Sequence, residues 1–303
     1  MPFIQLPACN THYEQQGHGD TPIVLLHGNF GSWHYWQDFL QHLPEGYRAY
    51  APDFRGCGDS EAPAAGYHIE TLSEDILQFV NHLQFDSFHL VGHSLGGAVA
   101  QQLASHIPER IISLTLVAPA PASGLMRVQQ LPAADSWFSA ENIFQFLGQI
   151  NIKRQIISAS IKKSMPGLVK RQHYLNQAVD DALKMDPKAF SGFLATLKSW
   201  TGADLLKHFS FPVLIIYGDL DSVIPLQALK DMQQKISHCR LHIMRNIGHS
   251  PQLEQPSAFN KLLSAFICGN EIELNTEQII HAKRLGVLSK LQLIFKRLLH
   301  NNN

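Results

Sequence analysis

Short apolar runs of strand length alternate along this chain with segments in which apolar residues recur at a helical spacing. The runs cover residues 22–26, 88–91, 112–117 and 212–217, and the helical patterns cover residues 71–83, 96–106 and 226–235. Strands that are apolar on both faces are buried in a parallel sheet that helices cover on both sides. The alternation therefore predicts an α/β fold with a mostly parallel central sheet.

Charge and composition exclude several classes of protein. The 303 residues include 24 Lys and Arg and 25 Asp and Glu, and 45% of them are hydrophobic while 16% are charged. A disordered chain has fewer apolar residues and a higher net charge, so this composition favours a large buried core. The net charge of -1 also lacks the basic excess that drives binding to nucleic acid. We expect a globular protein without a nucleic-acid partner.

Neither the cysteines nor the known cofactor motifs indicate a bound group. The 4 cysteines are scattered without a C-x-x-C pair, which argues against a disulfide framework and a thiolate metal site. The chain has no H-E-x-x-H sequence, no P-loop and no dinucleotide motif between a strand and a helix. We expect no metal and no cofactor. Because no apolar stretch reaches bilayer length and the chain begins without a secretory pattern, we expect a cytoplasmic protein.

Changes in sequence character predict three regions. Residues 1–121 and 206–270 carry the alternation of strands and helices, and we assign them to the core. Between them the strand-like runs disappear and the pattern becomes helical, so residues 122–205 are predicted to form a helical cap inserted over the sheet. Residues 271–303 are predicted to form a basic amphipathic helical extension.

The extension has three possible roles. Its basic residues recur every seven positions at Lys283, Lys290 and Arg297, and apolar residues occupy another side of the same helix. Such a helix could dock on its own domain, form a homodimer through residues 276–300, or lie on an anionic membrane as a peripheral contact.

A glycine-rich turn carries the strongest chemical signal. Residues 92–97 read GHSLGG and join the apolar run at 88–91 directly to the helical pattern at 96–106. Strand, tight turn and helix in this order are the context of a G-x-S-x-G nucleophile elbow. Glycines remove bulk where strand and helix approach, and the serine would stand at a helix N-terminus, which favours negative charge. The motif predicts Ser94 as a nucleophile.

A serine hydroxyl needs a base, and the base needs a group that holds its tautomer. His249 follows Gly248 on a loop after the strand-like residues 241–244, and it is the candidate base. Two carboxylates, Asp219 and Asp221, follow the run at 212–217, where a strand of the predicted sheet ends. Sites in open α/β folds gather at this end of the strands, so either carboxylate could orient the base.

These motifs resemble those of the α/β-hydrolase superfamily over residues of about 20–120 and 206–268. The resemblance includes His27-Gly28, the sequence DFRGCGDS at 53–60, the elbow, the G-x-x-D loop at 218–221, and Gly248-His249 followed by EQP at 254–256. It implies the α/β-hydrolase fold, with Ser94 as nucleophile, Asp221 as orienting acid and His249 as general base. Asp219 remains the rival for the role of the acid.

The resemblance also implies an oxyanion hole made of backbone N–H groups. One would belong to Leu95 and the other to Asn29, with Phe30 as the alternative. We assign five candidate substrate-binding residues: Phe30, His93, Phe144, Phe146 and Leu147. The last three lie in the predicted cap, where residues at helical spacing could equally form the cap's own core.

The implied function is that of a serine hydrolase that cleaves a small-molecule ester, lactone or thioester through an acyl-enzyme. A serine nucleophile departs from the haloalkane dehalogenases and most epoxide hydrolases of this superfamily, which use aspartate. Carbon–carbon bond hydrolases usually carry Trp after the catalytic histidine, where this chain has Ser250, although that reaction stays open. A ligand-binding or receptor-like homologue with little turnover also stays open.

Overall fold

The computed structural model describes residues 2–125 and 153–271. The chain divides into two compact units, Met1–Asn270 and Glu271–Asn303. Nearly all of the second unit, and with it the predicted amphipathic helix at 276–300, lies outside the described residues, as do residues 126–152 of the predicted cap.

An eight-stranded sheet forms the centre of the described chain, with the strand order β1-β2-β4-β3-β5-β6-β7-β8. The pairs from β4 to β8 are parallel, and β1 and β2 are added antiparallel at one edge. The strands are β1 (Phe3–Gln5), β2 (Asn10–Gly17), β3 (Thr21–Leu26), β4 (Tyr47–Pro52), β5 (Phe88–His93), β6 (Ile111–Val117), β7 (Val213–Gly218) and β8 (Cys239–Met244). The prediction of a mostly parallel sheet is confirmed.

The four apolar runs became the neighbouring strands β3, β5, β6 and β7 in the middle of the sheet. Every residue of β5 and β7 is buried, which is why β7 is an almost unbroken apolar run and β5 carries apolar residues beside its two buried histidines. The strands β1, β2 and β4 were missed by the sequence analysis. β2 has the sequence NTHYEQQG and is only half buried, so its polar residues hid it from a search for apolar runs.

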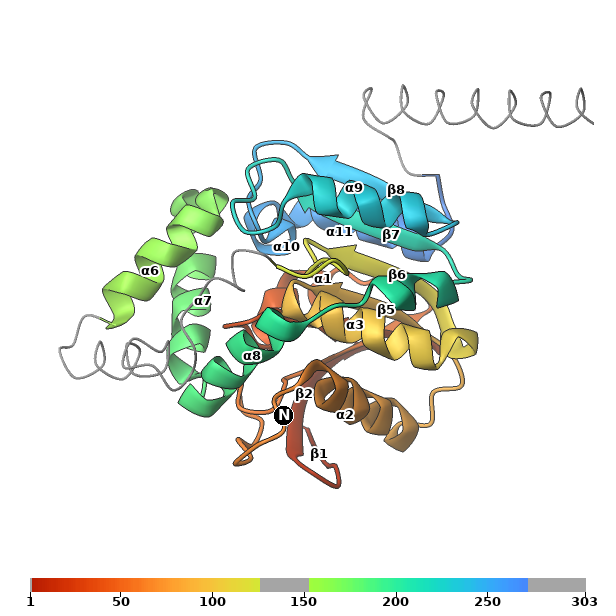
Figure 1. Cartoon of the computed structure of the whole chain (residues 1–303), viewed down its shortest axis with the longest axis horizontal. Helices are drawn as coiled ribbons and strands as arrows, with labels where there is room; N and C mark the ends of the chain where they lie inside the picture. The colour runs from red at the N-terminus through yellow and green to blue at the C-terminus, as the bar shows by residue number, and fades with distance from the viewer. Residues whose placement is uncertain (1, 126–152, 272–303) are drawn as a thin grey trace, which may run out of the picture. The chain divides into compact units, whose positions relative to one another are not determined.

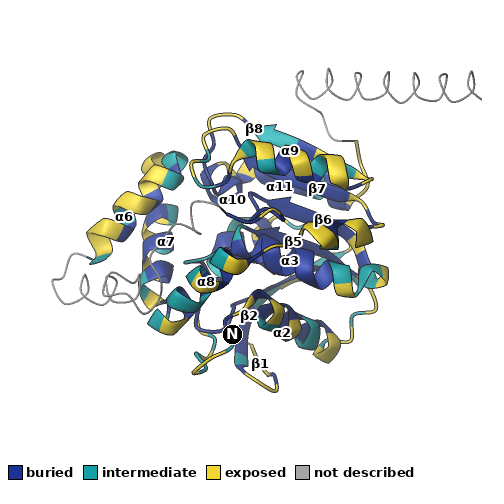
Figure 2. Cartoon of the chain, viewed as in Figure 1, coloured by how far each residue is buried: buried dark blue, intermediate teal, exposed yellow. Residues whose placement is uncertain are grey.

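Helices cover both faces of the sheet (Figure 1). The helices α2 (Ile69–His82), α3 (Leu95–His106) and α9 (Leu226–Lys235) lie in front of it in this view, and α1 (Gln37–Gln41) and α11 (Pro256–Ile267) lie behind it. The central strands and most of α3 are buried, whereas the outer sides of α2 and α9 are exposed (Figure 2). The sheet and the inner helix faces thus form the core.

A helical region follows β6 in the chain and precedes β7. Its described part contains α6 (Lys153–Ser164), the 3₁₀ helix η3 (Pro166–Lys170), α7 (Gln172–Lys184), α8 (Pro187–Ser199) and the 3₁₀ helix η4 (Ala203–His208). The α8 helix begins where the Asp186 side chain accepts a hydrogen bond from the Lys188 N–H, with proline as its first residue. The assignment of residues 122–205 as a cap remains a prediction.

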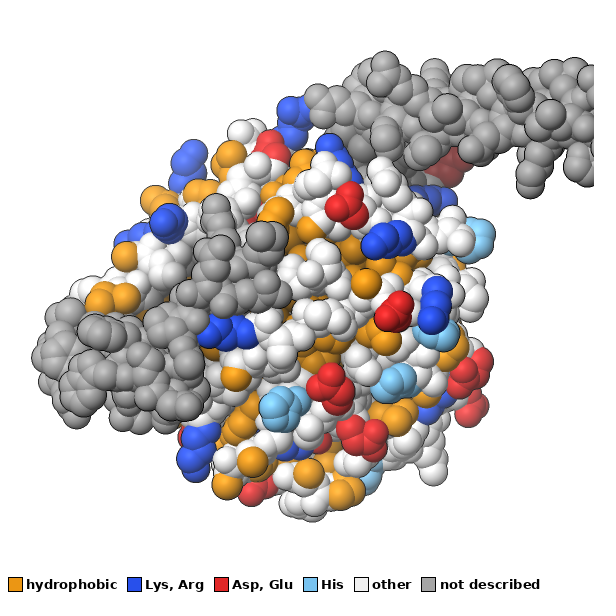
Figure 3. Space-filling model, in the orientation of Figure 1, with side chains coloured by type: hydrophobic (Ala, Val, Ile, Leu, Met, Phe, Trp, Pro, Cys, Tyr) orange, Lys and Arg blue, Asp and Glu red, His pale blue; other side chains and the backbone are white. Residues whose placement is uncertain are grey.

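Basic and acidic side chains are scattered over the face of the molecule shown in Figure 3. Among residues 2–125 and 153–271, no helix combines the length and the apolar character that crossing a bilayer requires.

Candidate active site

Ser94 lies at a strained turn between β5 and α3. Its backbone has φ 53° and ψ -113°, in the region of positive φ that residues with a side chain rarely adopt. The turn is held on both sides, because the Ser94 N–H donates to the Val117 carbonyl at 3.0 Å and the Ala120 N–H donates to the Ser94 carbonyl at 2.9 Å. The neighbouring strand β6 and the residues after it therefore fix the serine in this conformation.

The glycines around Ser94 are required by close packing. A Cβ placed on Gly92 would lie 2.3 Å from the carbonyl oxygen of Gly96, and one placed on Gly96 would lie 2.4 Å from the carbonyl oxygen of His27. Real Cβ atoms do not approach backbone oxygens this closely, so any side chain would separate α3 from β5 or from the end of β3. The steric reason given for the sequence motif is thus present in the structure.

The structure brings the side chains of Ser94, His249 and Asp221 into one chain of hydrogen bonds. The Ser94 Oγ lies 3.0 Å from His249 Nε2, and His249 Nδ1 lies 2.8 Å from Asp221 Oδ2. The histidine is 6% exposed, and the carboxylate side chain is fully buried. Because a carboxylate accepts, Nδ1 carries the proton and Nε2 is left to accept from the serine hydroxyl.

Asp221, and not Asp219, faces the histidine. Its second oxygen, Oδ1, accepts from the backbone N–H groups of Val223 at 2.6 Å and Ile224 at 3.0 Å, which fixes the plane of the carboxylate. The carboxylate of Asp219 instead accepts from the Ile247 N–H at 3.4 Å. The two acidic side chains of this loop therefore hold different parts of the loop that carries His249.

Two backbone N–H groups near Ser94, those of Leu95 and Asn29, are the predicted oxyanion donors. Leu95 is the first residue of α3, so its N–H has no partner within the helix. The Phe30 N–H donates to the Asn29 side-chain oxygen at 3.0 Å, whereas the Asn29 N–H carries no hydrogen bond within the described part of the chain. This difference favours Asn29 over Phe30 as the second donor.

The family model of the alpha/beta hydrolase fold matches residues 21–256. This span contains the turn at Ser94 and the loops of Asp221 and His249. The chain belongs to the alpha/beta hydrolase family.

Proteins similar to this alpha/beta hydrolase are named for several different activities. A 2-hydroxy-6-oxononadienedioate/2-hydroxy-6-oxononatrienedioate hydrolase of Escherichia coli O139:H28 is 28% identical over 277 residues, which cover 84% of this chain and 90% of that protein. Among solved structures, an esterase from Exiguobacterium antarcticum has a TM-score of 0.75 at 21% identity and covers 88% of this chain and 98% of its own. An enol-lactonase from Burkholderia xenovorans LB400 has a TM-score of 0.75 at 21% identity, with 88% and 100% covered.

The loop that carries Asn29 in this alpha/beta hydrolase is braced by His27. Its Nδ1 donates to the Gly28 carbonyl at 2.8 Å, and its Nε2 accepts from the Phe54 N–H at 2.9 Å. Complete burial lowers the pKa of His27, which keeps the ring neutral and able to make both bonds. The motif His27-Gly28 thus joins the end of β3 to the loop after β4.

His93 lies beneath the site and does not line an open pocket. The ring is 1% exposed, and its Nε2 donates to the His249 carbonyl at 2.9 Å. Burial, and then repulsion from His249, lower the pKa of His93 well below its usual value, so the ring is neutral. Our assignment of His93 as a substrate-binding residue finds no support in this position, which suits a side chain that holds the histidine loop.

The remaining substrate-binding candidates divide into two groups. Phe30 is half-buried, and its ring packs against that of Phe190 in α8 with a centroid distance of 5.1 Å. Phe144, Phe146 and Leu147 lie outside the described residues, so their assignment stays a prediction.

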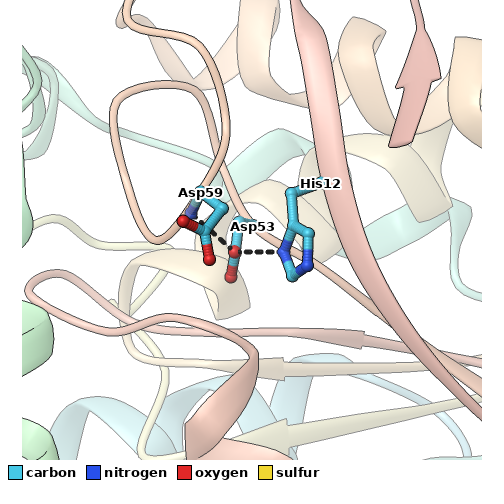
Figure 4. Close-up of side chains that lie close together, drawn as sticks. All are labelled: His12, Asp53 and Asp59. Carbon is cyan, nitrogen blue, oxygen red and sulfur yellow. Dashed lines mark hydrogen bonds and ion pairs between the residues drawn. The ribbon is translucent and has the colours of Figure 1, made fainter. Parts of the chain in front are cut away.

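One cluster in the described chain offers side chains that a metal could use, namely His12, Asp53 and Asp59 (Figure 4). Asp53 Oδ2 accepts from His12 Nδ1 at 2.7 Å and from the Asp59 N–H at 3.1 Å, and Oδ1 accepts from the Trp33 N–H at 2.7 Å. A Cβ on Gly58 would lie 2.0 Å from Asp53 Oδ2, so the loop backbone fills the space beside it. These contacts fit a carboxylate that fixes its loop.

Two buried acids near the site were not found from the sequence. Asp181 of α7 accepts from the Ser32 hydroxyl at 2.9 Å and lies 3.0 Å from His34 Nδ1, which ties the helical region to the loop after β3. Glu254 contacts the backbone on both sides of His249. The sequence EQP at 254–256 was noticed as a motif, but the pattern alone gave the glutamate no role.

Proposed function

We propose that this protein is a serine hydrolase that cleaves a small-molecule carboxylic ester, lactone or thioester through an acyl-enzyme on Ser94. The observation that carries the proposal is the unbroken set of hydrogen bonds from the Ser94 Oγ through His249 to Asp221. A buried carboxylate, a histidine in the correct tautomer and a half-buried serine at a strained turn are the parts that activate a hydroxyl at neutral pH.

In the first step His249 Nε2 takes the proton of the Ser94 hydroxyl while the oxygen attacks the carbonyl carbon of the substrate. The negative charge that develops on the carbonyl oxygen would be stabilised by the N–H groups of Leu95 and Asn29. Asp221 stabilises the imidazolium that forms, because its Oδ2 accepts from Nδ1. The imidazolium then protonates the leaving alcohol, enol or thiol, and the acyl group stays on Ser94.

In the second step a water molecule replaces the leaving group. His249 takes a proton from this water as the water oxygen attacks the acyl-enzyme, and the same N–H groups stabilise the second tetrahedral intermediate. When that intermediate collapses, the proton returns to the Ser94 oxygen and the carboxylic acid leaves. The described side chains supply every proton transfer in this sequence, so the proposal includes no cofactor.

The names of similar proteins support hydrolysis of small carbonyl compounds. Two proteins that share this fold are named as an esterase and an enol-lactonase, although their identities of 21% show the fold alone. We keep residues 122–205 as a cap and propose that it selects the acyl group, because α8 brings Phe190 against Phe30 beside the proposed oxyanion donor.

A carbon–carbon bond hydrolase is the second candidate, and the E. coli relative is the observation that favours it. That protein is named for a diene substrate with a keto group, and the match extends over most of both chains. In this chain Ser250 follows His249, and its hydroxyl lies 3.3 Å from His93 Nε2 inside the protein. A buried serine there gives a substrate no aromatic contact, which is why we place this candidate second.

Turnover of p-nitrophenyl esters of increasing acyl length tests the proposal. We expect wild-type protein to hydrolyse them, Ser94→Ala to lose at least about 10³-fold in kcat, and Ser257→Ala to match wild type because Ser257 is exposed on α11. A fluorophosphonate should label wild type and fail to label Ser94→Ala. Ester turnover that survives in Ser94→Ala would overturn the proposal.

Two further outcomes separate the alternatives. Loss of the dienol absorbance of a 2-hydroxy-6-oxo-diene acid, faster than hydrolysis of any ester and dependent on Ser94, would identify the carbon–carbon hydrolase. Ligand-dependent thermal shifts without turnover of either class would identify a binding protein on the same fold.

A further inference from the structure

The backbone of His249 is held by groups that lie outside the proposed triad. Its N–H donates to the carbonyl of Ser164, the last residue of α6, at 2.8 Å. Its carbonyl accepts from His93 Nε2 at 2.9 Å. The position of the imidazole therefore depends on two distant parts of the chain, the helical region before β7 and the elbow after β5.

Glu254 holds the residues on both sides of His249. Its Oε2 accepts from the Gly248 N–H at 3.0 Å, and its Oε1 accepts from the Ser250 N–H at 3.1 Å. Oε2 also accepts from the Gly167 N–H of η3 at 2.8 Å. Glu254 ends the short helix α10 (Pro251–Glu254), so a single carboxylate joins α10, the histidine loop and η3.

The surroundings of this carboxylate indicate that it is ionised when it makes these contacts. The residue is 4% exposed, and its hydrogen bonds in the described chain all come from backbone N–H groups, which favour the charged form. Burial is the largest effect and raises the pKa of Glu254 above its usual value, and the three N–H groups and the attraction of His249 offset only part of it. The three N–H donors are the contacts that a buried anion close to His249 would make.

Close packing surrounds the contacts of Glu254 with the histidine loop and with η3. A Cβ on Gly248 would lie 2.3 Å from the Ser164 carbonyl oxygen, and a Cβ on Gly167 would lie 3.0 Å from Glu254 Oε2. Gly248 is therefore needed where the histidine loop meets the end of α6, and a side chain at position 167 would crowd the carboxylate.

We propose that Glu254 is a positioning residue for the general base, which fixes the backbone of His249 from both sides, locks it to residues 164–167, and favours the imidazolium through its buried charge. This inference rests on the proposed function of His249. Glu254 acts through the backbone and the field at His249 and touches neither the substrate nor the reacting atoms.

The substitution Glu254→Gln separates this role from simple packing, because it keeps the size of the side chain and removes its charge. If the amide oxygen replaces Oε2, the amide NH₂ meets the Ser250 N–H, so two donors face each other. The loop must shift, and displacements on the order of 1 Å in a catalytic group reduce rates by about 100-fold.

The experiment measures kcat, KM and their pH dependence for wild type, Glu254→Gln, Glu254→Asp and the control Glu45→Gln, whose side chain is exposed on a loop. We expect kcat of Glu254→Gln to fall by about 10- to 100-fold with KM within about threefold. We also expect the acid limb of kcat/KM to move to lower pH, because a negative charge next to the imidazolium is lost. Glu45→Gln should match wild type.

Three other charged or titratable groups lie around His249. Asp221 bonds its Nδ1, and the His93 ring lies at a centroid distance of 5.0 Å. Asp219 accepts a hydrogen bond from the N–H of Ile247, two residues before His249. All of them remain in the variants, so a moved acid limb reports the change at position 254. Glu254→Asp keeps the charge on a shorter side chain, so we expect its kcat to fall and its acid limb to stay near the wild-type position.

Two results would overturn the inference. The first is obtained if thermal denaturation shows that Glu254→Gln is folded, while its kcat stays within twofold of wild type and the acid limb of its kcat/KM profile does not move. If Glu254→Gln does not fold, the inference is tested with Glu254→Asp. A kcat of Glu254→Asp equal to that of wild type would then overturn it. Failure of the proposed function would be seen separately, because wild-type protein would then show no turnover. In that case NMR titration of the His249 imidazole resonance still tests the inference. The midpoint of this titration must lie at lower pH in Glu254→Gln than in wild type.

Discussion

Gly218 lies so close to Gly248 that a Cβ on the first would stand 2.2 Å from the carbonyl oxygen of the second. Gly218 ends β7, and Gly248 follows β8, its parallel neighbour in the sheet. The segments that carry Asp221 and His249 therefore touch at these two glycines. This contact explains how Asp221 and His249, 28 positions apart in the sequence, come to share a hydrogen bond of 2.8 Å.

We predict that Asp221→Asn lowers kcat by about 10³- to 10⁴-fold. An asparagine amide that donates toward His249 Nδ1 would favour the tautomer with a proton on Nε2, which cannot accept from the Ser94 hydroxyl. Steady-state turnover of a p-nitrophenyl ester measures the loss, and circular dichroism checks the fold.

The matched control is Asp219→Asn on the same loop. Because Asp219 faces the Ile247 N–H and not the imidazole, we expect less than about a tenfold loss of kcat. A larger loss for Asp219→Asn than for Asp221→Asn would show that Asp219 holds the acid role and that our assignment to Asp221 is wrong.

We predict that the buried ion pair of Arg55 and Asp75 contributes strongly to stability. The guanidinium makes two bonds to the carboxylate, from Nε at 2.7 Å and from Nη2 at 2.6 Å, and the side chains are 3% and 10% exposed. Asp75→Asn leaves the buried guanidinium without its counter-charge, so the free energy of unfolding should fall by about 3–5 kcal/mol. Urea denaturation at neutral pH measures this change.

The control for that experiment is the surface pair of Arg154 and Asp180. Their side chains are 51% and 55% exposed, so water already solvates both charges. Asp180→Asn should therefore change the free energy of unfolding by less than about 1 kcal/mol. Equal effects of the two aspartate substitutions would contradict the difference that burial predicts.

His89 is predicted to make the protein less stable in mild acid. Burial lowers the pKa of His89 to about 4, and its Nδ1 bonds the Ser113 hydroxyl at 2.7 Å in the sheet. In the unfolded chain the ring takes up a proton near pH 6.5, so the native state loses stability as pH falls from about 6.5 to 4, by up to roughly 3 kcal/mol. Urea denaturation at pH 7 and pH 4.5 measures the loss.

The variant His89→Gln isolates this contribution, because glutamine does not titrate. Its stability should depend less on pH over this interval than that of wild type, while His18→Gln, at an exposed position, should show the wild-type dependence. If His89→Gln and wild type lost stability equally, the neutral state of His89 would not be the cause. Part of the loss should remain in the variant, since burial also lowers the pKa of His27 and His93.

Local sequence was informative where one element determined the outcome. The residues of β5 are buried throughout and mostly apolar at its start, and the turn at Ser94 lies between that strand and α3, so strand, turn and helix could be predicted from one continuous segment. In contrast, β4 has the sequence YRAYAP, and β2 is polar and antiparallel to it at the edge of the parallel strands. Their pairing depends on neighbours that a local pattern does not contain.

The amino-acid sequence by itself determined the parallel sheet, the serine at its tight turn and the histidine after a late strand, because apolar periodicity and the steric demands of glycine act over a few residues. Residue spacing left both Asp219 and Asp221 open and the family resemblance favoured Asp221, whereas the tertiary structure gives the contact of Asp221 with His249, the bond of His93 to the His249 carbonyl and the bonds of Glu254 on both sides of His249. Those outcomes depend on the order of strands in the sheet and on contacts such as that of Gly167 with Glu254, 87 positions apart. Distances of this kind are set when the whole core packs.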